Sequence, residues 1–160
     1  GDEGSGYDIG LRGIRRALLS KDGRRPPTAL TGAACLYFDV PSIGYVVGKL
    51  SRPRIQQPLI AGFAAMVSEA ANAGDEAAIE IIIDAGKALG ELAAFVAGRV
   101  FEREDTFPVV LAGGVFNAGD LLIDPLKAVM APQFPKAEFT IAKMSPGEAV
   151  ARLVRRMNLA

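Results

Sequence analysis

The sequence predicts a helix-rich α/β protein with an incomplete sheet. Residues 1–103 carry apolar positions at helical spacing, whereas residues 104–160 run in the order strand, helix, strand, helix. Only two strands are expected, and a parallel pair normally has further strands beside it and cover on both faces. We therefore expect a helical part at 1–103, a strand–helix segment at 104–160, and further strands upstream of Gly1.

Three short segments open the helical part. Residues 4–20 repeat apolar side chains at helical spacing, and the Asp-Gly pair that begins at residue 22 ends the pattern. A proline pair stands just ahead of a second helix, which is expected over residues 28–39. The stretch PSIGYVVGKL, residues 41–50, fits either a short helix or an edge strand, because its two glycines weaken both patterns.

Two alanine-rich helices follow. The first is expected over residues 58–73, and Asp75 is expected to cap the second, which runs towards Arg99. Because alanine and glycine faces let backbones approach closely, we expect these two helices to pack as an antiparallel pair. The expected buried stripe of the second helix consists of Ala78, Ile82, Ala85, Leu89, Leu92 and Val96.

The last third of the chain changes character. The run FPVVLAGGV is typical of a buried strand, and Asn117 with Asp120 is expected to cap the helix that follows. AEFTIAKM alternates like a second strand, and Ser145 is expected to cap the last helix. The expected buried face of that last helix consists of Val150, Leu153, Val154 and Met157.

Composition and charge exclude several classes of protein. The chain has 160 residues with 18 basic and 18 acidic side chains, so no basic excess is available to neutralise nucleic-acid phosphates. No apolar run reaches the roughly 18 residues of a transmembrane helix, and the basic residues are too scattered for a membrane surface. Histidine is absent and Cys35 is the single cysteine, which excludes a Ser-His-Asp triad, a zinc site and an internal disulfide. We expect a soluble, cytoplasmic protein.

The stretch VVLAGGVFNAGD, residues 109–120, is the clearest candidate for a binding site. A strand that ends in Gly113 and Gly114 exposes backbone to a ligand, and the helix that follows offers free N–H groups that favour phosphate. Ligands of open α/β sheets also bind at the carboxyl ends of strands. The alternative is that the glycines only shape a tight turn, since the stretch is neither a Walker A loop nor a dinucleotide-binding fingerprint.

The first six residues, GDEGSG, are a second candidate. A carboxylate at Asp2 or Glu3 beside flexible glycines can accept hydrogen bonds from sugar hydroxyls, but the stretch also fits a solvated turn that caps the next helix. Cys35 is expected in the core, and AGF at residues 61–63 has the small residues of a helix contact. The arginine pairs are expected on solvated faces rather than in a phosphate clamp: Arg15–Arg16, Arg24–Arg25 and Arg155–Arg156.

Several motifs occur together in a set order: GDEGSGYDIG, DGRRPPTAL, AGF, NAGDEAA, AGKALG and VVLAGGVFN. In this order and spacing they resemble the C-terminal half of the family that groups N-acetylglucosamine kinases and related amino-sugar kinases with the BadF/BadG/BcrA/BcrD-type ATPases. These ATPases activate benzoyl-CoA reductase and similar dehydratases. The family belongs to the sugar kinase, Hsp70 and actin superfamily, and the resemblance covers essentially all of the chain.

The resemblance implies two lobes of ribonuclease H-like fold, with ATP, Mg²⁺ and an amino sugar in the cleft between them. This chain would be the C-terminal portion of the second lobe. The catalytic base and the phosphate loops would lie upstream of Gly1, so the resemblance implies no catalytic residue here and no kinase activity of this fragment alone. Kinases of this kind are often dimers, which leaves a homodimer open without settling it.

Site residues carry over motif by motif. In the amino-sugar kinases the aspartate of GDEGS binds the sugar, which assigns that role to Asp2. The first residue of AGF lines the nucleotide pocket, which assigns that role to Ala61. The adenosine side of the pocket corresponds to Gly113, Gly114 and Ala118.

Some features of the chain distinguish activities within the family. The GDEGS and PPTAL stretches favour an amino-sugar kinase, with N-acetylglucosamine, glucosamine and N-acetylmuramic acid all open as substrates. The dehydratase activators hold an iron–sulfur cluster through cysteines, and Cys35 alone offers no such ligand set. An activator-type ATPase and a non-catalytic nucleotide- or sugar-binding module remain as alternatives. One departure is Asp8, placed where relatives commonly continue from an aromatic residue to isoleucine, and we expect it at the surface.

Overall fold

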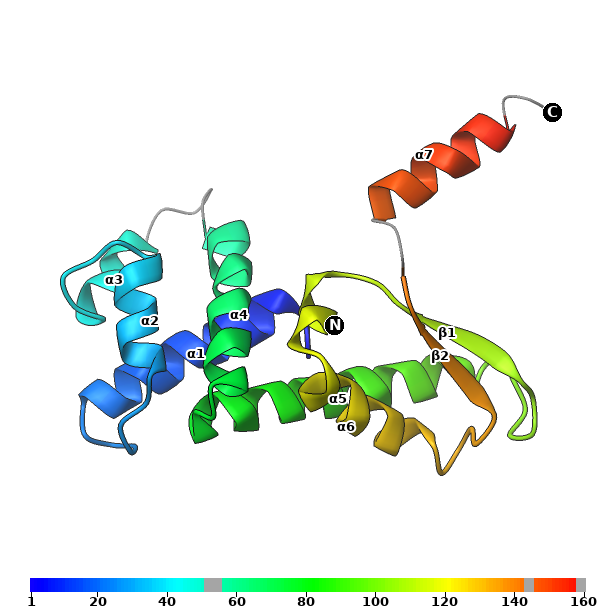
Figure 1. Cartoon of the computed structure of the whole chain (residues 1–160), viewed down its shortest axis with the longest axis horizontal. Coiled ribbons are helices and arrows are strands. Elements are labelled where there is room, and N and C mark those ends of the chain that lie inside the picture. The colour runs from blue at the N-terminus through cyan, green and yellow to red at the C-terminus, as the bar shows by residue number, and fades with distance from the viewer. Residues whose placement is uncertain (51–55, 143–145, 158–160) are drawn as a thin grey trace.

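Helices dominate the computed structural model, which describes residues 1–50, 56–142 and 146–157 (Figure 1). The predicted helix-rich α/β class is confirmed, with one small parallel sheet in the described ranges. Within those ranges no helix is both long and apolar enough to cross a membrane. The elements in chain order are α1 (Gly6–Lys21), α2 (Leu30–Tyr37), α3 (Gly44–Lys49), α4 (Gln56–Asn72), α5 (Glu76–Ala97), β1 (Phe107–Leu111), the 3₁₀ helix η1 (Gly114–Ala118), α6 (Asp120–Met130), β2 (Ala137–Ile141) and α7 (Pro146–Met157).

The main core forms where α1, α2 and α4 meet the first half of α5. Fully buried side chains such as Ile9, Phe38 and Phe63 fill it. Helix α1 crosses α4 at very short range. A Cβ atom built on Gly10 would lie only 1.9 Å from the carbonyl oxygen of Ile60. The absence of a side chain at this position therefore sets the distance between the two helices.

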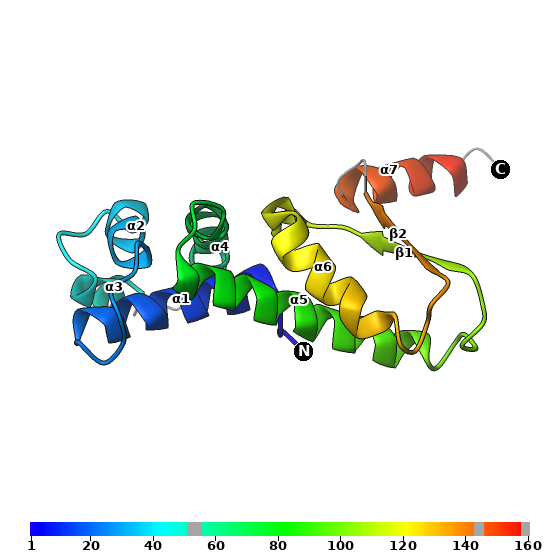
Figure 2. The same ribbon diagram turned by 60° about the horizontal axis from the view of Figure 1, so that its bottom comes forward.

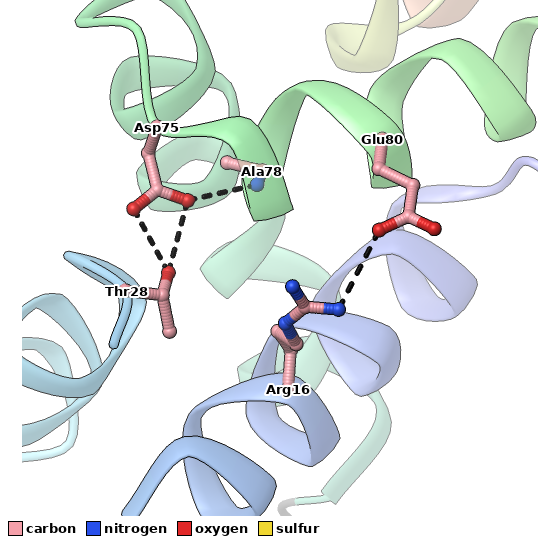
Figure 3. Close-up of polar contacts among 5 residues, drawn as sticks. All are labelled: Arg16, Thr28, Asp75, Ala78 and Glu80. Carbon is pink, nitrogen blue, oxygen red and sulfur yellow. Dashed lines mark hydrogen bonds and ion pairs between the residues drawn. The ribbon is translucent and has the colours of Figure 1, made fainter. Parts of the chain in front are cut away.

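Asp75 joins two parts of this core. Its side chain caps α5 by accepting from the Ala78 N–H at 2.9 Å, as the sequence predicts (Figure 3). The same carboxylate accepts from the Thr28 hydroxyl at 2.9 Å and from the Ala29 N–H at 2.7 Å. The loop ahead of α2 is thereby fixed to the start of α5.

Helix α5 has different partners along its length. Its first half packs in the main core, and its second half lies beside α6 (Figures 1 and 2). A Cβ atom on Gly86 would lie 2.2 Å from the carbonyl oxygen of Leu122, so the small residues of α5 let α6 approach closely. Helix α4 instead crosses α5 at a steep angle, so the predicted antiparallel pair of these two helices is wrong.

The change of partner also corrects the predicted buried stripe. Ala78, Ile82 and Ala85 are buried as expected, but Leu92 is 49% and Val96 is 54% exposed. Since α6 and β1 cover another face of the second half, the buried positions there are Gly90, Ala94 and Ala97. A prediction that keeps one buried face along the whole of α5 misses such a change of packing partner.

The two predicted strands form a parallel pair, in register from Phe107 opposite Ala137 to Leu111 opposite Ile141. Helix α6 connects them, and Phe107 and Leu111 point into a second core against α6 and the end of α5. Val110, on the other side of β1, is 61% exposed, so that side of the strand is uncovered in the described ranges. The sheet therefore buries one side only, as expected of an incomplete sheet.

The structure tests predictions for α3 and for the start of α6. The ambiguous stretch at residues 41–50 contains a helix, α3, rather than an edge strand. Helix α6 has Gly119 as its N-cap with no side-chain hydrogen bond, so the predicted Asn117–Asp120 cap is wrong, because Asn117 lies inside η1. Ser145, the predicted cap of α7, lies outside the described residues.

The predicted buried face of α7 is described at one position only. Val154 is 49% exposed, contrary to the prediction. The side chains of Val150, Leu153 and Met157 lie outside the described residues.

Candidate functional site

A groove of about 610 Å³ lies between α4 and the turn that follows β1. This volume is within the usual range for small-molecule sites. Its lining contains Ala61 and Gly114, two of the residues assigned to the nucleotide pocket, and Gly6 at the start of α1. The sequence separates these three residues widely, and the fold brings them together at one surface.

The turn after β1 leaves its backbone open. Gly113 has φ 121° and ψ 162°, a conformation that side-chain-bearing residues rarely adopt. A Cβ atom built on Gly113 or Gly114 would meet nothing within 4 Å, so the backbone borders free space. Gly114 lines the groove, and Gly113 is its immediate neighbour outside the lining.

Ala118 has a different position from the other predicted residues. It is only 3% exposed and packs in the main core, together with Leu122. The side chain therefore supports the turn from behind and does not line the groove.

The wall formed by α4 is fixed from the back by α2. Tyr37 donates its hydroxyl hydrogen to the Leu59 carbonyl at 3.1 Å. A Cβ atom built on Gly62 would lie only 2.2 Å from this hydroxyl oxygen. The small residues of the AGF stretch thus line the groove and also allow close packing, since Gly62 leaves room for Tyr37.

The far end of the groove is polar. Ser68, Glu69 and Asn72 from α4 and Asn117 from η1 line it. None of these four residues was predicted from the sequence as a site residue. Ala61, Ser68 and Asn72 follow one another at helical spacing, so a search along the face of Ala61 would have found them.

Asp2 lies beside a second hollow, of about 390 Å³. Gly6 and Ala61 line both this Asp2 hollow and the groove, so the two spaces adjoin. Gln57, in the first turn of α4, lines the Asp2 hollow as well. In the described part of the chain the Asp2 carboxylate has no hydrogen bond or ion pair, which leaves its oxygens available to a ligand.

Asp8 holds the loop that carries Asp2. Its carboxylate accepts from the Gly4 N–H at 3.0 Å and pairs with the Arg12 guanidinium at 3.0 Å. The Asp8 N–H in turn donates to the Ser5 hydroxyl, which caps α1. With 21% of its side chain exposed, Asp8 is a loop-fixing residue rather than the surface residue that was expected. The signal was present in the sequence, since Ser5 and Asp8 have the spacing of a capping box.

The described ranges hold no group of three or more histidine, cysteine, aspartate or glutamate side chains that fits a metal ion. The cysteine, Cys35, is partly buried beside the main core, near its expected place.

Comparison with known proteins defines the family. The model of the BadF/BadG/BcrA/BcrD ATPase family matches residues 1–145. The chain belongs to this family. Within the match lie the Asp2 loop, the AGF stretch of α4 and the glycine turn after β1.

Two curated proteins are similar to this member of the BadF/BadG/BcrA/BcrD ATPase family. The N-acetyl-D-glucosamine kinase of Dictyostelium discoideum is 30% identical over 155 residues, which are 96% of this chain and 49% of the relative. The N-acetylmuramic acid/N-acetylglucosamine kinase of Clostridium acetobutylicum is 29% identical over 143 residues, which are 89% of this chain and 47% of the relative. The chain spans about half the length of the curated relatives it matches.

Proposed function

We propose that this chain supplies the adenosine side of the ATP site, and one sugar contact, of an amino-sugar kinase. The observation that carries the proposal is the junction of the groove with the Asp2 hollow at Gly6 and Ala61. A kinase needs its nucleotide and its acceptor sugar side by side, and two adjoining spaces satisfy that need. The names of the two similar kinases support the same assignment.

The groove residues have distinct roles in this proposal. Ala61 and Gly114 would contact the nucleoside, Gly113 would keep the backbone open, and Ala118 would hold the turn from the core. The fit rests on the volume of the groove and on the free space beside the two glycines. ATP would supply the transferable phosphoryl group, and these residues bind and orient it.

Asp2 would accept a hydrogen bond from a hydroxyl of the sugar. Its free carboxylate and its place at the Asp2 hollow support this role. Asp8 would act on Asp2 through the loop, as a positioning residue. Mg²⁺ is usually held by one or two carboxylates together with phosphate oxygens. The described residues contain no group of three or more acidic, histidine or cysteine side chains that could hold a metal ion.

The proposal extends to the architecture of the whole protein. We infer that the parallel pair with α6 is part of a ribonuclease H-like lobe, and that residues 1–103 and 104–160 divide as a helical part and a strand–helix segment. The uncovered side of β1 supports a sheet that continues with other strands. A homodimer and the inactivity of this chain by itself belong to the same proposal.

A coupled assay of ATP turnover on the full-length protein tests the function. The panel contains N-acetylglucosamine, glucosamine, N-acetylmuramic acid and a buffer without sugar. We expect turnover that depends on one of the sugars, which would also identify the substrate. Slow ATP hydrolysis that is indifferent to every sugar would contradict the kinase and favour an activator-type ATPase. ATP binding without hydrolysis would favour a non-catalytic module.

A further inference from the structure

A separate hollow of about 220 Å³ lies between α1 and α5, and it shares no lining residue with the groove or the Asp2 hollow. We call it the arginine hollow. Its charged lining residues are Arg12, Arg15, Arg16, Arg25, Glu80 and Asp84. Four arginine residues from two segments of the chain thus line one small space. Arg15–Arg16 and Arg24–Arg25 are expected on solvated faces, and Arg15 and Arg25 are exposed as predicted. The place of Arg25 next to α1 could not be predicted from the sequence.

The two acidic residues of the arginine hollow already have cationic partners. Glu80 pairs with Nη1 of Arg16 at 3.5 Å (Figure 3). Asp84 pairs with Lys87 at 3.3 Å. The contact of Arg16 is long, and its buried Nε has no acceptor within the described ranges. The charge of Arg16 is therefore only weakly compensated by the protein.

The other arginines leave a positive excess. Arg12 pairs with Asp8 at 3.0 Å. Arg15 and Arg25 are exposed, and in the part of the chain that the structure describes neither has an acidic partner. The arginine hollow therefore carries two cationic groups that no carboxylate neutralises.

The position of Arg25 is fixed by the backbone rather than by its own side chain. The N–H groups of Arg24 and Arg25 donate to the Leu19 carbonyl at 2.9 and 3.2 Å. At the other end of the same loop, Thr28 is bonded to Asp75. Because the loop is held at both ends, the backbone that carries Arg25 needs little ordering when a ligand binds, and pre-ordered segments bind more tightly.

We propose that the arginine hollow binds a small dianionic phosphate, either inorganic phosphate or the phosphate of a monoester. Guanidinium groups match the oxygens of phosphate with paired, charge-assisted hydrogen bonds. The small volume suits a phosphate with a small attached group rather than a nucleotide. The site is separate from the proposed kinase site, so its occupancy does not depend on that function.

Isothermal titration of the full-length protein tests the proposal, with inorganic phosphate in one arm and glycerol 2-phosphate in the other. Ionic strength is kept constant with chloride, because exposed charges are screened by salt. The test variant combines Arg15→Gln with Arg25→Gln. The control variant combines Arg103→Gln with Arg152→Gln, which removes the same charge from exposed positions outside the arginine hollow.

We expect saturable binding to the wild type, weakened about tenfold or more in the test variant, since each charge-assisted hydrogen bond that is lost costs about that factor. The control variant should bind like the wild type, and so should Ala61→Trp, which obstructs the groove. Preference for one arm would identify the source of the phosphate. No saturable binding to the wild type would overturn the proposal, and so would equal weakening in the test and control variants. The unfolding midpoint in chloride verifies that each variant is folded.

Discussion

Asp8 and Asp75 are carboxylates that accept hydrogen bonds from backbone N–H groups at the starts of helices. Asp8 fixes the loop that carries Asp2, and Asp75 fixes the loop that carries Arg25. The Asp2 carboxylate itself has no hydrogen bond or ion pair in the described ranges, although it lies beside a hollow. The ligand-facing carboxylate is thus free, while its neighbours are committed to structure.

Replacing Asp2 with Asn should lower kcat/KM for the sugar about tenfold to a hundredfold in the full-length protein. A hydrogen bond to a charged acceptor contributes about 1.5–3 kcal/mol, which corresponds to this range. The KM for ATP should stay close to that of the wild type. Steady-state kinetics at saturating ATP measure the effect, with Glu3→Gln, 68% exposed at its side chain, as the matched control. Equal sugar kinetics in Asp2→Asn and the wild type would remove Asp2 from the site.

Asp75→Ala should lower the free energy of unfolding by about 1–3 kcal/mol at pH 7, because it removes a helix cap and the anchor of the Thr28 loop. Urea unfolding measures this difference. Glu91→Ala, at an exposed position of α5 where the side chain has no partner among the described residues, should stay within about 0.5 kcal/mol of the wild type. A loss no greater than that of the control would show that the Asp75 bonds do not stabilise the fold.

The contribution of Asp75 should also depend on pH. Burial by itself raises the pKa of Asp75. The hydrogen bonds from Ala29, Ala78 and Thr28 together lower the pKa by more than burial raises it, so the net pKa lies below its ordinary value. A carboxyl group whose pKa is lowered by folding stabilises the protein above its unfolded-state pKa of about 3.9, and this stability is lost as pH falls through the folded-state value. The difference between wild type and Asp75→Ala should therefore shrink below about pH 4. A difference that grows on acidification would have the wrong sign.

Helices illustrate what sequence patterns could predict. Periodicity and caps located α1, α4 and α5, a short apolar run ending in glycines located β1, and the alternation of apolar residues located β2. The partners of α5 could not be predicted in this way, because its small residues admit any close neighbour. The structure gives that place to α6 rather than to α4, and the exposed Leu92 and Val96 follow from the same change.

Close contact between α1 and α4 gives a prediction of its own. Gly10→Ala should destabilise the protein by about 1–3 kcal/mol, because the new methyl group collides with the backbone at Ile60. Gly32→Ala is the matched control: it lies in α2 with no atom within 4 Å of a new Cβ, and it should stabilise by about 0.4–1 kcal/mol. Denaturant unfolding of both variants measures the pair. Equal effects of the two substitutions would contradict the close packing of α1 on α4.

The whole molecule brings together residues that only a family resemblance could connect. Ala61 and Gly114 line one groove, and Asp2 lies beside the adjoining hollow, so these predicted site residues lie near one another in the fold. Composition and spacing could not have paired them, since α5 and β1 separate Ala61 from Gly114 in the chain. Ala118 was assigned to the pocket but is buried behind it, because a motif match does not distinguish contact from support.

Nucleotide binding by the groove is measured by titrating ATP into the full-length protein and its variants by calorimetry. Ala61→Trp places a large ring at the junction of the groove and the Asp2 hollow. Ala128→Trp, at an exposed position of α6 outside both spaces, is the matched control. We predict that ATP binds the wild type and the control alike and binds Ala61→Trp at least about tenfold more weakly, a loss of about 1.4 kcal/mol. Equal affinity of all three proteins for ATP would place the nucleotide elsewhere and contradict the proposed site.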